Sequence, residues 1–257
     1  MPEIPDLNIF QKNLSAKLVG QKLATISILI ERRLRRPVVD FKSSLEGAKL
    51  DSIKRFGKEL HFAFDNGHSL GLHLMLYGEM HWFEGVNENR FPIADLMFDN
   101  GSGLAICDWQ KSVILTLDPV ESKVPDALDI PSGYLAAKLS KSSKAIKTLL
   151  TDGKVVGGIG NAYVDEILYN AKISPLSQAN KIPEDRIEIL EKSIEVVLNN
   201  AERHIVENFP FTINEKERDF LQVHRPKEKL TLAGEEILKV EIDKRKTYYT
   251  QSQYLFD

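Results

Sequence analysis

The second and third residues of the chain, Pro2 and Glu3, could together perform a covalent attack on an aldehyde carbon. Because Met1 precedes a small residue, we expect its removal, which leaves Pro2 as a free secondary amine. An amine attacks an aldehyde carbon and forms an iminium, which acts as an electron sink. An α-amino group titrates near pH ~8, so part of it is neutral and nucleophilic under physiological conditions. The adjacent Glu3 carboxyl can move protons for it. On its own, this start is a weak signal, because many proteins begin Met-Pro-Glu and an inert terminus is the more common interpretation.

A glycine-rich turn at residues 157–161, Gly-Gly-Ile-Gly-Asn, is the second candidate. It precedes a predicted helix with Val164, Ile167 and Leu168 on one face. Backbone N–H groups at such a helix start bind phosphate, and the Asn161 side chain can add a donor. The alternative is a plain turn between two helices, and these residues alone leave both interpretations open.

Composition excludes several classes of site. The single cysteine, Cys107, rules out an intramolecular disulfide and a multi-cysteine zinc site, and the six histidines show no close ligand pair. We therefore expect neither a metal nor a cofactor. The sequence has no long apolar run and no signal-peptide pattern, so a cytoplasmic protein that does not bind membranes is expected. With a net charge of −3, any nucleic-acid site must rest on local basic patches.

The first half of the chain must position Pro2 and Glu3. Residues 6–19 are predicted to form a helix, with Asp6 as N-cap and Gly20 as the stop. Residues 22–118 are predicted to form short strands, because apolar runs are separated by turns and Asp-Asn-Gly occurs twice between them. We interpret residues 1–120 as a β-sandwich domain with a leading helix.

The second half must position the glycine turn. A proline-containing linker is predicted at 121–133, followed by a helical domain at 134–222. Its helices include one around 142–152 and a long one that begins near Pro183. Residues 223–257 alternate in polarity around a basic turn, Asp-Lys-Arg-Lys, which predicts a terminal β-hairpin. The predicted fold class is therefore α+β.

Three segments, in the same order and spacing, resemble the formamidopyrimidine-DNA glycosylase and endonuclease VIII family of base-excision enzymes. Residues 2–6 are similar to that family's Pro-Glu-Leu-Pro-Glu start, and residues 56–60 to its Arg-x-Gly-Lys-x-Leu segment. Residues 157–175 match its helix–two-turn–helix signature almost letter for letter. The resemblance spans nearly the whole chain and implies the same two-domain fold.

The resemblance implies a bifunctional DNA glycosylase and AP lyase. Pro2 would attack C1′ of the damaged nucleotide, Glu3 would protonate the sugar ring oxygen, and Lys58 would hold a phosphate beside the lesion. β-Elimination and then δ-elimination would follow, after the nucleotide has left the stack. The residues implied to bind DNA are Lys147, Lys154, Gly160, Asn161 and Arg245.

The family usually ends in a four-cysteine zinc finger, and this chain departs from that pattern. Thr231, Thr250 and Gln253 stand near three of the ligand positions. Residues 244–247, Lys-Arg-Lys-Thr, nevertheless occupy the place of the finger tip that contacts phosphate. The sequence therefore resembles the zincless-finger variant, with Arg245 at its tip.

The residues that fill the gap left by the flipped nucleotide also differ. Leu76 replaces the family's methionine, and Gln110 and Ser112 replace an arginine and a phenylalanine. We expect Leu76 and Gln110 to fill the gap, with Tyr77 and Trp109 as alternative wedges. The family's preference for cytosine opposite the lesion is not carried over.

The segment after the long helix is shorter than in members that prefer 8-oxoguanine, which favours formamidopyrimidines and oxidised pyrimidines as substrates. We expect a monomer whose partner is damaged double-stranded DNA. The alternative is a catalytically silent binder of damaged or abasic DNA. A helix–two-turn–helix protein of ribosomal or topoisomerase type would explain the glycine turn, but neither residues 2–6 nor the hairpin.

Overall fold

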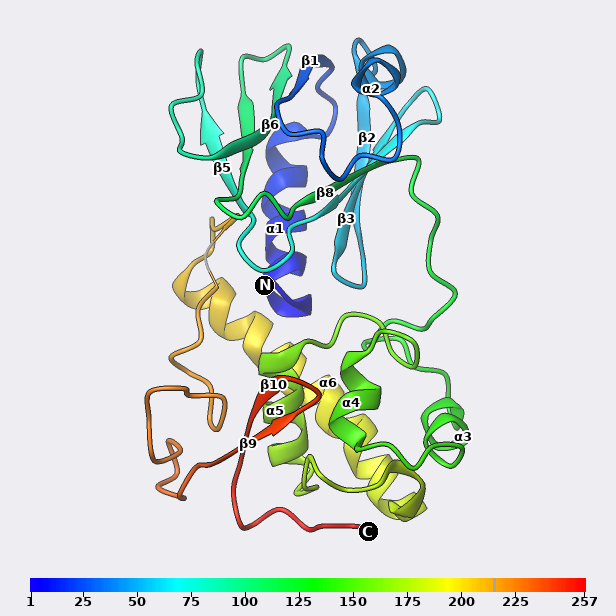
Figure 1. The fold of residues 1–257 in the computed structure, drawn as a ribbon. Coiled ribbons are helices and arrows are strands. Elements are labelled where there is room, and N and C mark those ends of the chain that lie inside the picture. The colour runs from blue at the N-terminus through cyan, green and yellow to red at the C-terminus, as the bar shows by residue number, and fades with distance from the viewer. Residues whose placement is uncertain (215) are drawn as a thin grey trace. The chain divides into compact units, whose positions relative to one another are not determined.

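The computed structural model describes residues 1–214 and 216–257, which form two compact units (Figure 1). The first unit contains Met1–Glu121 and Ile205–Lys216, and the second contains Ser122–His204 and Glu217–Asp257. The sequence analysis assigned residues 205–216 to the helical domain, whereas in the structure they pack with the first unit.

The first unit is a sandwich of two antiparallel four-stranded sheets, with strand orders β1-β6-β7-β5 and β2-β3-β4-β8. The β-sandwich prediction is therefore confirmed. Its strands are β1 (Leu23–Ile28), β2 (Leu50–Phe56), β3 (Glu59–Phe64), β4 (Ser69–His73), β5 (Glu79–Phe83), β6 (Pro92–Phe98), β7 (Gly103–Cys107) and β8 (Ile114–Leu117). Both Asp-Asn-Gly segments lie where predicted, in the β3–β4 and β6–β7 hairpins.

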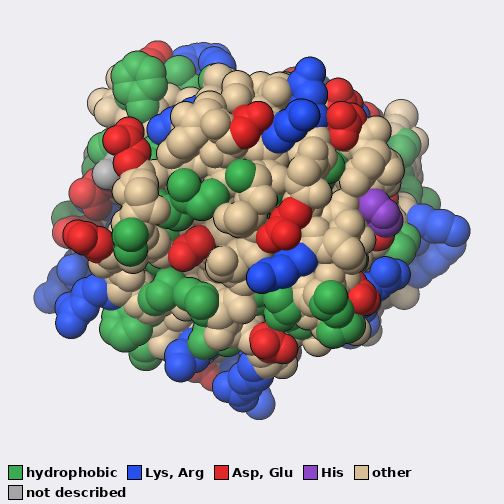
Figure 2. Space-filling model, turned by 90° about the horizontal axis from the view of Figure 1, so that it is seen from above, with side chains coloured by type: hydrophobic (Ala, Val, Ile, Leu, Met, Phe, Trp, Pro, Cys, Tyr) green, Lys and Arg blue, Asp and Glu red, His purple; other side chains and the backbone are tan. Residues whose placement is uncertain are grey.

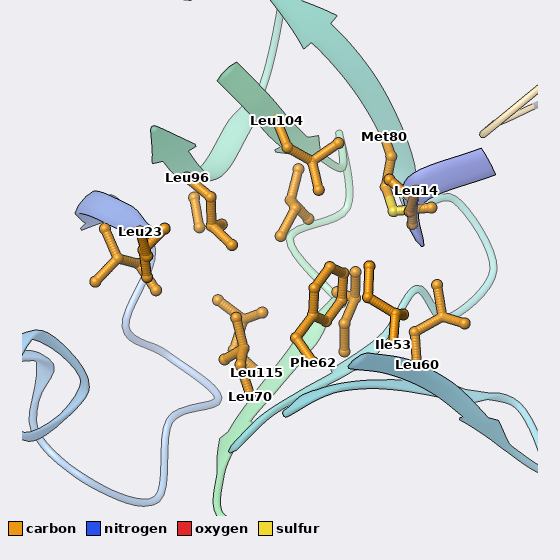
Figure 3. Packing of buried hydrophobic residues seen from close by; sticks show 14 of the residues in the cluster. Leu14, Leu23, Ile53, Leu60, Phe62, Leu70, Met80, Leu96, Leu104 and Leu115 are labelled. Atoms are coloured by element: carbon orange, nitrogen blue, oxygen red, sulfur yellow. The ribbon is translucent and has the colours of Figure 1, made fainter. Parts of the chain in front are cut away.

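The core of the first unit lies between the two sheets, because alternate residues of each strand point inward. Figure 3 shows Phe62 and Ile53 of one sheet near Leu104 of the other. Leu14 of the leading helix joins the same cluster and is fully buried. Each such fully buried side chain contributes about 1.5–3 kcal/mol to stability relative to an exposed one.

The leading helix α1 (Ile4–Leu18) begins two residues earlier than predicted. Glu3, and not Asp6, is the N-cap, and Asp6 is the third helical residue. The Asp6 carboxylate accepts a hydrogen bond from the Glu3 backbone N–H at 2.8 Å, which is one half of a capping box. The expected stop is confirmed, since Gly20 follows the C-cap with a positive φ of 89°.

The second unit is helical and carries the helix–two-turn–helix segment. Its elements are α3 (Tyr134–Leu139), α4 (Ile146–Thr151), α5 (Asn161–Asn170), the 3-10 helix η1 (Ala179–Lys181) and most of α6 (Glu184–Asn208). The predicted helices appear as α4, α5 and α6, whereas α3, and α2 (Val38–Leu45) in the first unit, were not predicted.

The chain ends in the predicted hairpin, β9 (Leu238–Ile242) and β10 (Arg245–Tyr249). Its turn has two residues, Asp243 and Lys244, with φ of 48° and 62°. Positive φ at both positions is typical of the tight turn that matches strand twist. The predicted four-residue turn is therefore too long, because Arg245 pairs with Ile242 inside the ladder.

Surface charge is mixed on the face drawn in Figure 2, where acidic and basic side chains alternate without a patch of one sign. A sequence-independent DNA site needs clustered positive charge, so this face is a poor candidate. Within the described residues, no helix is long and apolar enough to cross a membrane.

Candidate functional site

Pro2 and Glu3 lie directly at the start of helix α1, and both are buried. The Glu3 carbonyl accepts the first helical hydrogen bond, from the Leu7 N–H, at 3.0 Å. Together with the Asp6 bond to the Glu3 N–H, this fixes the Glu3 backbone at the start of the helix. Two side chains on adjacent residues at a helix start keep a nearly constant separation, as the predicted roles of Pro2 and Glu3 require.

Lys58 lies in the two-residue turn between β2 and β3, with Gly57 at a positive φ of 57°. The Arg55 guanidinium braces this turn. Its NH1 donates to the Gly57 carbonyl at 3.0 Å, and its Nε donates to the Asn8 side chain of α1 at 2.6 Å. The turn that carries Lys58 is therefore tied to the helix that carries Glu3.

The structure adds His73, whose part in this site the sequence analysis missed. Its pKa is lowered, first by burial and then by the positive charges of Lys58 and the N-terminal amine, against the opposing effect of Glu59. Its Nδ1 accepts the Met75 N–H at 3.0 Å, so the neutral ring carries its proton on Nε2.

Cys107, the single cysteine of the sequence, is a second possible nucleophile in the first unit, and it is buried. Burial raises the pKa of its thiol to about 11. Because the thiolate is the reactive form, this thiol is inert near neutral pH.

The predicted gap-filling residues lie on two loops of the first unit. Leu76 and Gln110 are both exposed, and their neighbours Tyr77 and Trp109 contact each other with ring centroids 5.0 Å apart. The structure therefore brings the two loops together. Whether either side chain enters DNA remains a prediction.

In the second unit, Gly160 is the N-cap of α5 in an extended conformation, and Asn161 is the first helical residue. The Asn161 side-chain N–H donates to the Lys246 carbonyl of the hairpin at 3.0 Å. Lys154 lies in the preceding loop and is exposed. The helix start is thus linked to the hairpin, while no described contact links it to Lys154.

The hairpin tip is held on α4 and α5 by polar contacts. The Thr148 hydroxyl donates to the Asp243 carboxylate at 2.5 Å, and the Arg245 guanidinium donates to the Thr151 hydroxyl. Lys246 supplies the carbonyl that Asn161 contacts. The hairpin residues Arg245 and Lys246 therefore contact α4 and the start of α5, respectively.

Lys147 was predicted to bind DNA, but its side chain is buried in the structure. Its side chain is 1% exposed, and its Nζ donates to the fully buried Asp165 carboxylate at 2.7 Å and to the Lys246 carbonyl at 3.3 Å. A buried ammonium held in this way does not reach a phosphate. The Lys147 ammonium instead links α4 to Asp165 of α5 and to the Lys246 carbonyl of the hairpin.

Asp165 extends this link to the end of the chain. Its second oxygen accepts from His224 Nδ1 at 2.8 Å and from the Tyr248 N–H at 3.2 Å. One carboxylate therefore joins α4, α5, the segment before the hairpin and strand β10.

Three of the positions expected for zinc ligands, Thr231, Thr250 and Gln253, are buried and bonded to protein groups. The Thr250 hydroxyl donates to Glu235 at 2.9 Å, and the Thr250 N–H donates to the Gln253 side chain at 2.8 Å. Hydroxyl and amide groups are poor zinc ligands. No group of three His, Cys, Asp or Glu able to hold a metal occurs among the described residues. These residues do not fit zinc, and hydrogen bonds hold the finger instead.

The Glu235 carboxylate is the centre of that network. Hydrogen bonds from Ser252, Tyr169 and Thr250 lower its pKa to about 2. A lowered pKa in the folded state gives stability that is present above the unfolded value of about 4.3 and is lost as pH falls towards the folded value. We expect the finger to open between these two pH values, as measured by hydrogen exchange of residues 238–249.

The matched variant for this prediction is Glu235→Gln, which should make the exchange rates of the hairpin nearly independent of pH in that range, after correction for intrinsic exchange. A chelator should leave the wild-type rates unchanged. Chelator-induced opening of the hairpin would show that a metal, and not this network, holds the finger.

A β-sandwich led by a helix, joined to a helix–two-turn–helix unit with a terminal hairpin, defines the structural class of the chain. The model of the formamidopyrimidine-DNA glycosylase N-terminal domain matches residues 1–113, and the model of that enzyme's H2TH domain matches residues 122–207. The chain belongs to the formamidopyrimidine-DNA glycosylase and endonuclease VIII family. The match over residues 1–113 removes the ribosomal or topoisomerase alternative.

Individual proteins of known family support the same assignment. The formamidopyrimidine-DNA glycosylase of Streptococcus mutans is 32% identical over 215 residues, covering 76% of this chain and 78% of the relative. That of Bacillus subtilis is 31% identical over 216 residues, covering 78% of each. A complex between the Lactococcus lactis Fpg and abasic-site DNA has a TM-score of 0.88 at 26% identity, covering 98% of this chain and 100% of that one. MutM in complex with DNA containing carbocyclic 8-oxo-G has a TM-score of 0.86 at 27% identity, covering 97% and 98%.

Proposed function

We propose that this DNA glycosylase of base-excision repair is also an AP lyase that works through a Schiff base on Pro2. The observation that carries the proposal is the placement of Pro2 and Glu3 on the fixed, buried start of α1. With Met1 removed, the Pro2 amine attacks C1′, the bond from C1′ to the damaged base breaks, and the base leaves with those electrons and takes up the proton that the Pro2 nitrogen loses. Glu3 donates a proton to the sugar ring oxygen, which opens the ring and yields the iminium.

The elimination steps follow from the iminium. The positive nitrogen withdraws electrons, so a C2′ proton is lost and the 3′ phosphate leaves by β-elimination. Loss of the 5′ phosphate by δ-elimination then gives a one-nucleotide gap with phosphate ends. We assign Lys58 to a phosphate beside the lesion, because Arg55 ties the turn that carries it to helix α1, whose start holds Glu3.

Damaged double-stranded DNA is the proposed partner, and the protein acts as a monomer without metal. Formamidopyrimidines and oxidised pyrimidines are the proposed substrates, because residues 209–222 leave little length for a loop that closes over 8-oxoguanine. The test is a gel assay on duplexes that each carry one lesion. Products with phosphate at both ends support the proposal, while intact strands after an alkali-free reaction contradict the lyase.

Arg245 is proposed to contact a phosphate, because it is exposed on the hairpin surface held beside Asn161. We expect Arg245→Ala to weaken binding to all sequences alike and to lower the slope of log affinity against log salt by about 1. The measurement is fluorescence anisotropy with an uncleavable abasic analogue over a salt series. Arg33→Ala, an exposed arginine of the first unit, is the control that should keep the slope. An unchanged slope in Arg245→Ala would count against the contact.

The catalytically silent binder stays as the second candidate function. It shares every DNA contact with the enzyme and differs only at the Pro2 nitrogen, which is an amide while Met1 is attached. Mass measurement of the purified chain therefore belongs with every activity assay.

A further inference from the structure

A hollow of ≈ 310 Å³ lies entirely within the second unit. It is lined by a face of α5 that includes Glu166 and Asn170, by a face of α6 that includes Asn200 and His204, and by residues 220–222. Pockets that bind small molecules begin at about 300 Å³, so this hollow has the size for one small ligand. The chemistry proposed at Pro2 uses none of these residues.

The walls of the hollow are joined to one another. The Glu166 carboxylate accepts the three backbone N–H groups of residues 222–224 at 2.8, 2.8 and 2.7 Å, which bonds this segment to α5. On the other side, the His204 ring of α6 contacts the Phe220 ring, with centroids 4.2 Å apart. The segment is therefore held on both helices, and a ligand would meet a hollow that is already formed.

The inside of the hollow is apolar and aromatic. Tyr163, Ala201 and Leu221 line it and are buried. The paired rings of His204 and Phe220 line it as well, and both are half-buried. A planar ring that leaves water for such a surface gains free energy from burial and from stacking on the aromatic side chains.

Three carboxamides surround this apolar surface. Asn170 and Asn200 are exposed, Gln222 is half-buried, and all three line the hollow. Within the described part of the chain, their side-chain amides make no hydrogen bond to another residue. A carboxamide carries a donor beside an acceptor, so these groups can pair with a ligand edge that also has one of each.

The hollow offers no counter-charge to an ionic ligand. Neither lysine nor arginine is among the described residues that line it, and their one acid is Glu166. Both Glu166 oxygens already accept backbone N–H groups. Because an unpaired charge is costly to bury, the hollow is suited to an uncharged ligand and not to a phosphate, a carboxylate or an ammonium.

We propose that this hollow is a binding site for free adenine or adenosine. A carboxamide pairs with adenine through two hydrogen bonds, accepting from the N6 amino group and donating to N7. Asn200 and His204 lie one turn apart on the same face of α6, so a base that stacks on the paired rings lies beside the Asn200 amide. The site is independent of the proposed lyase chemistry.

The test is calorimetric titration of the full-length protein with adenosine, together with hydrogen exchange of residues 220–224. Adenosine should bind and slow this exchange, because the segment forms one wall of the hollow. Inosine has an oxygen in place of the N6 amino group, so it should bind about 5- to 150-fold more weakly. The absence of both binding heat and slowed exchange at millimolar adenosine overturns the proposal.

Variants of the lining residues localise the site. Asn200→Ala and Phe220→Leu should each weaken adenosine binding about 5- to 150-fold, whereas Phe220→Tyr should keep it. Asn199→Ala is the matched control, because Asn199 is the exposed neighbour on α6 and does not line the hollow. Unchanged affinity in both Asn200→Ala and Phe220→Leu would show that adenosine binds elsewhere.

Charged ligands test the last step of the argument. Adenosine monophosphate should bind more weakly than adenosine, because no cation lining the described hollow meets its phosphate. Tighter binding of the monophosphate, or displacement of adenosine by a short oligodeoxyadenylate, would overturn the assignment to a free, uncharged ligand. None of these measurements uses abasic DNA, so they and the lyase proposal can fail separately.

Discussion

Glu3→Gln should slow excision of a damaged base by about 10²–10⁴-fold, the usual contribution of a positioned general acid. The amide keeps the size of the carboxyl but cannot give its proton to the sugar ring oxygen. The helix start should survive, because the bond from the Glu3 N–H to Asp6 involves the backbone of residue 3. The measurement is single-turnover excision from a duplex that carries a formamidopyrimidine.

The control for Glu3→Gln is the same variant on a preformed abasic site. Such a site opens to its aldehyde without help, so strand cleavage should lose much less than excision does. An equal loss on both substrates would indicate that Glu3 serves the helix and not the proton transfer. Full excision activity would remove Glu3 from the mechanism.

The second large effect is expected at Asp165, whose carboxylate is the counter-charge of the buried Lys147. Asp165→Asn removes that charge and leaves an ammonium at 1% exposure without compensation. Breaking one partner of a buried ion pair costs about 3–5 kcal/mol. We expect a loss of this size in the free energy of opening of α4 and α5, measured by hydrogen exchange.

Lys147→Met is the matched variant and should cost less, because Asp165 keeps the His224 ring and the Tyr248 N–H as donors. Protection of α1, in the first unit, should not change in either variant. A cost below about 1 kcal/mol for Asp165→Asn would mean that the ion pair is not what fixes the hairpin on α5. If Asp165→Asn also lowers DNA affinity, Arg245→Ala should add little to it, since both changes act on the same tip.

The sequence predicted those elements of the fold that carry a strong local signal. The Asp-Asn-Gly turns and the periodicity of α1, α5 and α6 are strong signals, and these elements lie within a few residues of their predicted places. Within the predicted strand region 22–118, strand β2 has no alternating pattern of its own, because Leu50, Ile53 and Phe56 are three residues apart. A register shift between Leu50 and Ser52 explains why Leu50 and Ile53 are both buried, since a bulge turns the following residues to the other face.

Short helices gave no comparable signal. Helix α3 has 6 residues and α2 has 8, which is too few for a periodic apolar stripe to stand out. The start of α1 was predicted two residues too late, because aspartate is a common N-cap residue. In the structure Asp6 is the third helical residue and Glu3 is the N-cap.

The sequence could predict the site residues whose type alone determines their chemistry. It could not predict which partners the fold would place next to them. Pro2, Glu3 and Arg245 follow from their motifs, and their roles remain proposals. Nothing in the local sequence distinguishes Lys147 from other helical lysines. Its partner Asp165 is 18 residues away along the chain, and the Lys147 Nζ lies 2.7 Å from the Asp165 Oδ1. The neutral state of His73 and the bonded state of Thr250 also arise from partners that no local pattern reveals.

The central claim is that Pro2 forms the covalent bond to DNA, and borohydride trapping tests it most directly. The protein, with loss of Met1 verified by mass, is mixed with an oligonucleotide that carries one abasic site and is then reduced. We predict a covalent adduct whose DNA-linked peptide begins at Pro2, and a much smaller yield from Pro2→Gly. Tight binding without any adduct, from protein that begins at Pro2, would contradict the lyase and leave the silent binder of abasic DNA as the function.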